Sequence, residues 1–250
     1  MSLDMGAALG LARSLAIYYG QPWKRAAMRR FYAGLLRPGD LVFDIGAHVG
    51  SRTRVFRAIG ARVVALEPNP MLAAFLARPL PKEGIVLASE AVGAEPGVLR
   101  LRISRRHPTV SSGAPGWIDA AGRTAGFRAV AWDETAIVPV TTLDRLIAAY
   151  GRPDFVKIDV EGMEPAILAG LSSPLPLLSF EYLPAVRDGA FASIDRLSAL
   201  GLYRFNRVEG ERQRFVSAEW GDADAMRAIL AALPANASSG DIYARLEGAS

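Results

Sequence analysis

The chain has 250 residues, of which 51% are hydrophobic, and this is enough to bury the core of one large domain. It contains no cysteine, which excludes disulfides, thiolate metal ligands and covalent thiol catalysis. The net charge of +4 comes almost entirely from arginines scattered along the chain, an arrangement that argues against a nucleic-acid-binding protein. No transmembrane run of about 20 apolar residues and no secretion signal is visible, so we expect a cytoplasmic protein.

Two segments at the start of the chain, Met5 to Tyr19 and Pro22 to Leu36, carry apolar residues at helical spacing. We expect residues 1–36 to form a helical cap ahead of the main domain. This cap either packs on a sheet edge with solvated arginines or closes over a ligand. Four basic residues give it a face that also allows weak contact with a membrane surface, namely Lys24, Arg25, Arg29 and Arg30.

The segment Val42 to Ser51, VFDIGAHVGS, joins a buried apolar run to an acid and two spaced glycines. The apolar residues suit a covered strand around Asp44. Gly46 and Gly50 permit backbone angles and a close ligand approach that a Cβ would block. The pattern predicts a strand that leads into a nucleotide-type binding turn, although an ordinary strand-to-helix turn can share it.

A helix (Arg52 to Ile59) and a second apolar run (Arg62 to Leu66) follow, and an acid recurs at Glu67, 23 residues after Asp44. This spacing fits a βαβ unit, in which the second acid accepts hydrogen bonds from ribose hydroxyls. The chain lacks both the GxGxxG of dinucleotide sites and the Lys-Ser/Thr pair of triphosphate loops, so we expect an adenosine without phosphates. The residues expected to hold it are Asp44, Gly46, Ala47, His48, Gly50, Ser51, Glu67, Pro68 and Asn69.

The chain then continues through a third strand, Ile85 to Ser89, and an extra strand, Val98 to Ile103, which we expect to extend the sheet outward. The segment from Ser104 to Ile137 has no dependable period, and long irregular segments in compact domains are often functional lids. We therefore expect residues 104–137 to be an insertion on the substrate side. His107 is its one side chain with an unperturbed pKa near neutrality, although a lone loop histidine is usually just solvated.

A second constellation, DFVKIDVEGMEP, begins at Asp154 and contains another buried strand, Phe155 to Ile158, that ends in acids. In a doubly wound sheet the first and fourth strands are neighbours and ligands bind outside their carboxyl ends, so Asp44 and Asp159 should flank one crevice. Lys157 lies on the same strand face as Asp159, and a buried ammonium needs a partner. We expect that partner to be Asp159 or Glu181, a pairing as compatible with a structural role as with a catalytic one.

The remaining elements complete an alternating pattern of strands and helices. We expect a short strand at Val138 to Val140, helices at Met71 to Ala77, Leu143 to Ala149, Met163 to Gly170, Phe191 to Leu200 and Ala223 to Ala232, and strands at Leu177 to Phe180, Leu202 to Val208 and Asp241 to Leu246.

In this order and spacing, VFDIGAHVGS, VVALEPNP, SEAVG, VTTLD and VKIDVEGMEPAILAG resemble the FkbM family of S-adenosylmethionine-dependent methyltransferases, over residues 40–181. The resemblance implies an α/β, Rossmann-like class I methyltransferase fold over residues 37–250, with a seven-stranded, mostly parallel sheet and helices on both faces. It implies S-adenosylmethionine as the methyl donor, and a hydroxyl of a small natural product or glycan as the acceptor. The implied neighbours of the adenine are Ser89, Glu90 and Ala91, and His48 stands where the family often has Asn.

A hydroxyl acceptor needs a base, and the candidates are Asp159, Glu161, Glu181 and His107, with Lys157 as a further candidate for a catalytic role. Asp159 and Glu161 could instead orient the amino group of the donor or cap the next helix. No histidine is near these carboxylates in sequence, so we expect no metal. The missing GxGxxG argues against the alternative of a nicotinamide-dependent oxidoreductase, whereas a nucleoside-binding domain without turnover stays open.

Overall fold

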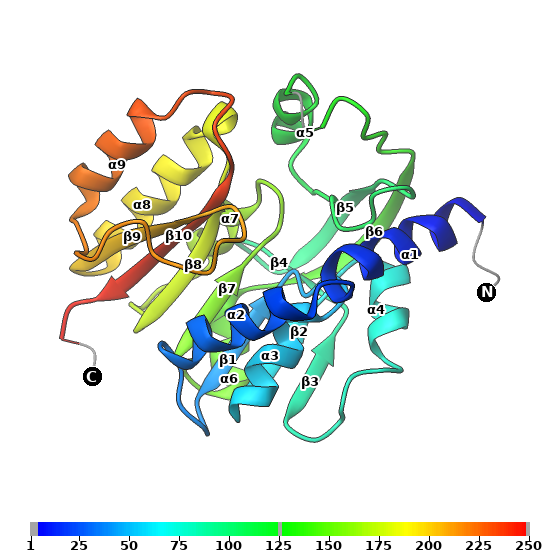
Figure 1. The fold of residues 1–250 in the computed structure, drawn as a ribbon, viewed down its shortest axis with the longest axis horizontal. Coiled ribbons are helices and arrows are strands. Elements are labelled where there is room, and N and C mark those ends of the chain that lie inside the picture. Colours follow the sequence, from blue (N-terminus) through cyan, green and yellow to red (C-terminus); the bar gives the residue numbers. More distant parts are fainter. Residues whose placement is uncertain (1–4, 125–126, 249–250) are drawn as a thin grey trace.

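One mixed sheet organises the described residues, 5–124 and 127–248, of this computed structural model (Figure 1). In the described chain it has seven strands in the order β3-β2-β1-β7-β8-β10-β9. Their bounds are β1 Leu41–Ile45, β2 Arg62–Leu66, β3 Ile85–Ala88, β7 Phe155–Ile158, β8 Leu177–Tyr182, β9 Tyr203–Glu209 and β10 Gly240–Leu246. The expected cap, insertion and main domain also include residues 1–4, 125–126 and 249–250, which lie outside the described residues.

The strand order reverses between β1 and β7. Strand β1 is parallel to both β2 and β7, with Asp44 in register with Ala65 on one side and Lys157 on the other. Strand β10 is antiparallel to both of its neighbours, β8 and β9. The carboxyl ends of β1, β2 and β7 therefore meet at one edge, and the expectation that the first and fourth strands are neighbours is confirmed.

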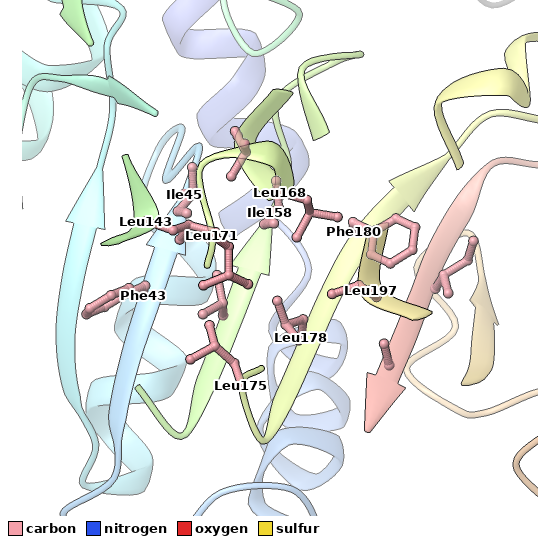
Figure 2. Close-up of a cluster of buried hydrophobic side chains, with 14 of the residues drawn as sticks. Phe43, Ile45, Leu143, Ile158, Leu168, Leu171, Leu175, Leu178, Phe180 and Leu197 are labelled. Atoms are coloured by element: carbon pink, nitrogen blue, oxygen red, sulfur yellow. The ribbon is translucent and has the colours of Figure 1, made fainter. Parts of the chain in front are cut away.

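Helices cover both faces of the sheet, because successive strand residues point to opposite sides. Phe43, Ile45 and Ile158 pack with helices α6, α7 and α8 in the larger core, shown in Figure 2. Val42 and Phe155 point the other way, toward α2 and α3, where an aromatic cluster fills the second core. The helices are α2 Pro22–Ala33, α3 Ser51–Ile59, α4 Pro70–Leu76, α6 Leu143–Tyr150, α7 Glu164–Ala169, α8 Asp188–Leu200 and α9 Ala223–Ala232.

A second, three-stranded sheet contains β4 (Ala91–Val92), β6 (Glu134–Thr141) and β5 (Gly97–Ile103), in that order. The expectation that Val98 to Ile103 extends the main sheet is therefore wrong. The buried residues of β5 instead form a small separate core with residues of β6. The segment expected to be irregular also contains helix α5 (Pro115–Ala121), which at 7 residues is too short to show a period in the sequence.

The two N-terminal helices, α1 (Met5–Tyr19) and α2, cross one face of the molecule (Figure 1). The α1 helix packs against loops at the carboxyl edge of the sheet: the Tyr19 hydroxyl donates to the Val49 carbonyl at 2.8 Å. The backbone of Gly10 lies so close to the Arg105 carbonyl that a Cβ would approach its oxygen to 2.2 Å. No described helix is both long enough and apolar enough to cross a membrane.

Candidate active site

A pocket of about 490 Å³, counted to its open mouth, lies at the carboxyl ends of β1, β2 and β7. One wall comes from the main sheet and its loops, and the other from the small sheet and the segment that follows β5. The lining residues include Gly46, His48, Glu67, Pro68, Asp159, Val160 and Met163 on the first side, and Glu90, Ala91, Leu99, Leu101, Pro108 and Ser111 on the second. We refer to this space as the first pocket.

The turn after β1 owes its shape to residues with positive φ. At Gly46, with φ of +81°, a Cβ would be 1.9 Å from the Asp159 carbonyl oxygen. At Gly50, with φ of +76°, a Cβ would be 2.8 Å from a methyl group of Leu76. Both glycines thus permit close packing of protein on protein. His48 has φ of +52°, which histidine and asparagine adopt more readily than most residues, and this fits a position where the resembled family often has Asn.

Glu67 fixes this turn and faces the first pocket. Its carboxylate accepts from the backbone N–H of His48 at 2.7 Å and from that of Asn69 at 2.8 Å. The side chain is buried, and burial raises the pKa of Glu67 to about 8 despite these two bonds. Each carboxylate oxygen can accept a further bond, so Glu67 remains able to accept ribose hydroxyls.

Asp44 lies behind the turn and does not line the first pocket. Its carboxylate accepts from the Thr53 hydroxyl at 2.5 Å, and burial raises the pKa of Asp44. Asn69 caps α4, where it accepts from the Met71 N–H at 3.0 Å, and it donates to the Pro108 carbonyl at 3.3 Å. Four other residues that were expected to hold the methyl donor also lie outside the lining of the first pocket, namely Ala47, Gly50, Ser51 and Ser89. Their direct contact with a ligand stays a prediction.

Lys157 is fully buried and stands in a network of ion pairs. Its Nζ is 3.0 Å from Asp241 Oδ1 and 3.6 Å from Asp159 Oδ2. Of the two expected partners, Asp159 is confirmed, whereas Asp241 takes the place of Glu181. The antiparallel strand β10 lies beside β8 and brings Asp241 opposite Glu181, which the sequence alone does not reveal.

Asp159 also pairs with Arg52, whose Nη1 is 3.0 Å from Oδ2. Burial alone would raise the pKa of Asp159, but Lys157 and Arg52 hold it well below its usual range. Likewise, burial alone would lower the pKa of Lys157, but Asp159 and Asp241 raise it. Both groups are therefore charged at neutral pH. The buried Nε of Arg52 has no partner among the described residues, so one donor remains available there.

A second pocket, of about 850 Å³ counted to its mouth, lies next to the first. Its lining comes from α5 and the residue before it, from β8 and α8, and from the short 3-10 helix Pro184–Val186. The two pockets share the loop that follows β7. Asp159, Val160 and Met163 line the first pocket, and the lining of the second includes Trp117, Gly162, Glu164, Glu181 and Tyr182.

The shared loop, residues 159–164, is tightly held by the insertion. Glu161 and Gly162 both have positive φ, +56° and +96°. A Cβ on Gly162 would be 2.3 Å from the Trp117 ring, so only glycine allows α5 to lie this close. The Ser112 hydroxyl donates to the Glu161 carbonyl at 2.6 Å. Residues of the insertion therefore line the second pocket and contact the shared loop, and the role of residues 104–137 in substrate recognition stays a prediction.

Three glutamates gather at this loop. Glu161 and Glu164 are buried and Glu181 is half-buried. Burial, with the neighbouring carboxylates, raises the pKa of Glu164 to about 7 and those of Glu161 and Glu181 well above their usual values. Glu161 Oε2 is buried and has no hydrogen-bond partner in the part of the chain that the structure describes. Among the described residues no histidine, cysteine or carboxylate group has the arrangement to hold a metal ion.

His107 lies apart from these carboxylates. Its Nδ1 is 3.3 Å from a guanidinium nitrogen of Arg13 in α1, and it lines neither pocket. Partial burial, Arg13 and Arg106 lower the pKa of His107. The structure therefore places this candidate base between the cap and the insertion.

Several site residues were missed from the sequence. Glu164 is the last acid of the KIDVEGME segment, so its signal was visible but unused. Arg52, Trp117 and Asp241 carry no local signal, because their neighbours come from distant parts of the chain.

The sheet order, with its reversal between β1 and β7 and its antiparallel β10, together with a pocket at the carboxyl edge, defines a class I methyltransferase fold. The model of the methyltransferase FkbM domain matches residues 44–234. The chain therefore belongs to the FkbM methyltransferase family, whose methyl donor is S-adenosylmethionine.

Individual relatives are more distant. A segment of 49 residues is 47% identical to ribosomal RNA large subunit methyltransferase E of Archaeoglobus fulgidus, and it covers 20% of this chain and 25% of that protein. The precorrin-6Y C5,15-methyltransferase of Geobacter metallireducens superposes with a TM-score of 0.47 at 15% identity, over 89% of this chain and 86% of the other. An O-methyltransferase from Bacillus cereus, in complex with SAH, gives 0.42 at 12% identity, over 99% and 93%.

Proposed function

We propose that this protein transfers the methyl group of S-adenosylmethionine to a hydroxyl oxygen of a glycan or another small natural product. The observation that carries the proposal is the loop at residues 159–164, which lines two adjacent pockets at the carboxyl edge of the sheet. One pocket offers a carboxylate to a ribose and the other offers carboxylates to an acceptor. A loop shared by both can bring two ligands together, as group transfer requires.

The residues of the first pocket fit the donor. Glu67 presents a carboxylate to ribose hydroxyls, and Leu101 and Ala91 give an apolar wall for the adenine. Arg52 does not line this pocket, but it pairs with Asp159, which does, and its buried Nε has no partner among the described residues. Bound S-adenosylmethionine would supply a methyl group already activated by its sulfonium.

The task left to this chain is to position the acceptor and remove its proton. We assign the removal of this proton to Glu164, because Glu164 lines the second pocket and directly follows Met163, which lines the first. Its pKa of about 7 suits a base that works near neutrality. Glu181 faces the same pocket and can accept a second hydrogen bond from the acceptor. Asp159 and Lys157 are held in ion pairs, so we assign them to the support of the loop.

The lining of the second pocket favours a polar acceptor that contains a ring. Trp117 and Tyr182 supply aromatic surface, and Glu164 and Glu181 supply acceptors for hydroxyl protons. Carboxylates that alternate with aromatic side chains suit a molecule with several hydroxyls on an apolar ring face. This combination is the reason to place glycans first among the acceptors.

The test is to incubate the protein with S-adenosylmethionine that carries an isotopically labelled methyl group and an extract of its own cells. Mass spectrometry should find a product that gains one labelled methyl on oxygen. Calorimetry with S-adenosylhomocysteine, the demethylated donor, measures donor binding separately. Failure of the homocysteine derivative to bind would overturn the donor assignment, and a label on nitrogen or carbon would overturn the assignment to oxygen.

A further inference from the structure

The outer surface of the two N-terminal helices is unusually apolar for a solvent-facing region. Leu9, Ile17 and Trp23 leave 66%, 45% and 67% of their surface exposed. They are three of the ten large hydrophobic residues exposed in the described chain, yet they fall within 15 residues, whereas the others are scattered over many elements. We call the exposed surface of α1 and α2 the cap face.

Most exposed positions of α1 are apolar, and one exposed arginine, Arg13, interrupts them. The exposed positions of this helix are occupied mainly by Ala8, Leu9, Ala12, Ala16 and Ile17, and Arg13 is the one charged residue of the helix. The buried side of α1 is held to the body through Tyr19, whose hydroxyl donates to Val49 and accepts from Arg54 at 3.1 Å. The apolar surface is therefore fixed outward and is not available to the core of this chain.

The charge of the same region is entirely basic. Residues 5–39 contain six arginines and lysines and no acidic residue, whereas acidic residues slightly exceed basic ones in the rest of the chain. Arg25, Arg29 and Arg30 are exposed and have no ion-pair partner among the described residues. Lys24 pairs with Glu211 at 3.2 Å in an exposed position. The uncompensated guanidinium groups thus belong to the same helix as Trp23.

We propose that the cap face docks on an anionic lipid bilayer, with Leu9, Ile17 and Trp23 in the interfacial layer and the arginines against the headgroups. Stable adsorption needs two contributions, apolar insertion and attraction to anionic lipid, and the cap face has both. Aliphatic side chains between the charges do not suit RNA, whose bases require aromatic stacking. Self-association would bring two basic surfaces together. This inference concerns binding alone and does not depend on the proposed methyl transfer.

The test is co-sedimentation of the full chain with vesicles of phosphatidylcholine, with or without phosphatidylglycerol. We expect binding to the anionic vesicles, weaker binding to the neutral ones and release at high salt. Arg29→Gln combined with Arg30→Gln should weaken partitioning roughly 25-fold, since each basic residue near such a surface contributes about fivefold. Leu9→Ser combined with Trp23→Ser should weaken it without removing charge.

Matched controls remove the same groups elsewhere. Arg78→Gln with Arg100→Gln removes two exposed charges, and Val98→Ser removes an exposed apolar side chain, all outside the cap face. Circular dichroism checks that each variant stays folded. The proposal is overturned if the natural chain does not bind anionic vesicles, or if the controls lose as much binding as the cap variants. It is also overturned if light scattering shows a dimer whose formation depends on Trp23. The same holds if the chain binds RNA in place of vesicles and this binding depends on Trp23.

Discussion

The two pockets of this protein are built in different ways. About half of the lining of the first comes from short segments at the ends of β1, β2 and β7, and those residues belong to compact motifs such as Val42 to Ser51. The second is assembled from α5, the loop after β7, the end of β8 and the start of α8. Its chemistry depends on which parts of the chain meet, and not on one motif.

The difference also appears in how charges are balanced. Beside the first pocket Asp159 is neutralised by Lys157 and Arg52, and Lys157 in turn holds Asp241. In the second pocket neither Glu164 nor Glu181 forms an ion pair with a cation of the described chain, and burial with the neighbouring carboxylates raises the pKa values of both. Paired charges fix a framework, whereas carboxylates with raised pKa values can exchange protons. The comparison predicts structural effects from the first group and catalytic effects from the second.

The largest expected effect is that of Glu164→Gln, which removes the proposed base. The turnover number should fall about 10²- to 10⁴-fold, while the affinity for S-adenosylhomocysteine in calorimetry stays unchanged. Because Glu164 must be ionised to accept a proton, activity of the natural protein should rise with pH through about 7. Glu181→Gln is the matched control in the same pocket. An active Glu164→Gln beside an inactive Glu181→Gln would move the base to Glu181.

The next largest effect concerns the buried ion pairs around Lys157. Lys157→Met should lower the free energy of unfolding by about 3–5 kcal/mol, because it leaves buried carboxylates without their cation. Denaturant titration measures this loss, and the remaining folded protein should transfer methyl groups at a near-normal rate. The double variant Lys157→Met with Asp241→Asn should recover part of the stability. Normal stability combined with lost turnover would instead make Lys157 catalytic.

Glu67→Gln tests the first pocket. Affinity for S-adenosylhomocysteine should fall about 10- to 100-fold, the range for hydrogen bonds to a charged group. Burial raises the pKa of Glu67 to about 8, so below that pH the free protein must lose a proton before the carboxylate can accept ribose hydroxyls. Affinity should therefore increase as pH rises through about 8, and this increase should be absent in the variant. Calorimetry across pH decides, and a flat profile for the natural protein would contradict the ribose assignment.

The smallest expected effect is that of His107→Ala. This side chain contacts Arg13 and lines neither pocket, so kcat/KM should stay within about twofold of the natural value. The same assay with Glu164→Gln gives the scale for a real loss. A large decrease for His107→Ala would return the histidine to the list of catalytic candidates and weaken the contrast between the two pockets.

Much of the main sheet was predictable, because buried strands and their acids leave local patterns. The boundaries of β2 and β7 agree with the expected segments, and so does the position of Glu67 at the end of β2. The small sheet was not predictable as a separate unit, because the alternation of apolar and polar residues in β5 does not show which strand pairs with it. Helix α2 ends at Ala33, three residues earlier than expected, since Leu36 turns into the core.

The sequence by itself determined the order of elements, the glycine turn after β1 and the FkbM resemblance, because each depends on residues close together in the chain. Only the tertiary structure decided that Lys157 pairs with Asp241, that Asp44 lies behind the turn and that Glu164 faces a second pocket with Trp117. Apart from the bond between Asp44 and Thr53, which are close in sequence, these arrangements join residues tens of positions apart, and the order of the strands in the sheet brings them together. The spacing of residues along the chain does not predict these contacts, because they depend on which strands become neighbours in the sheet.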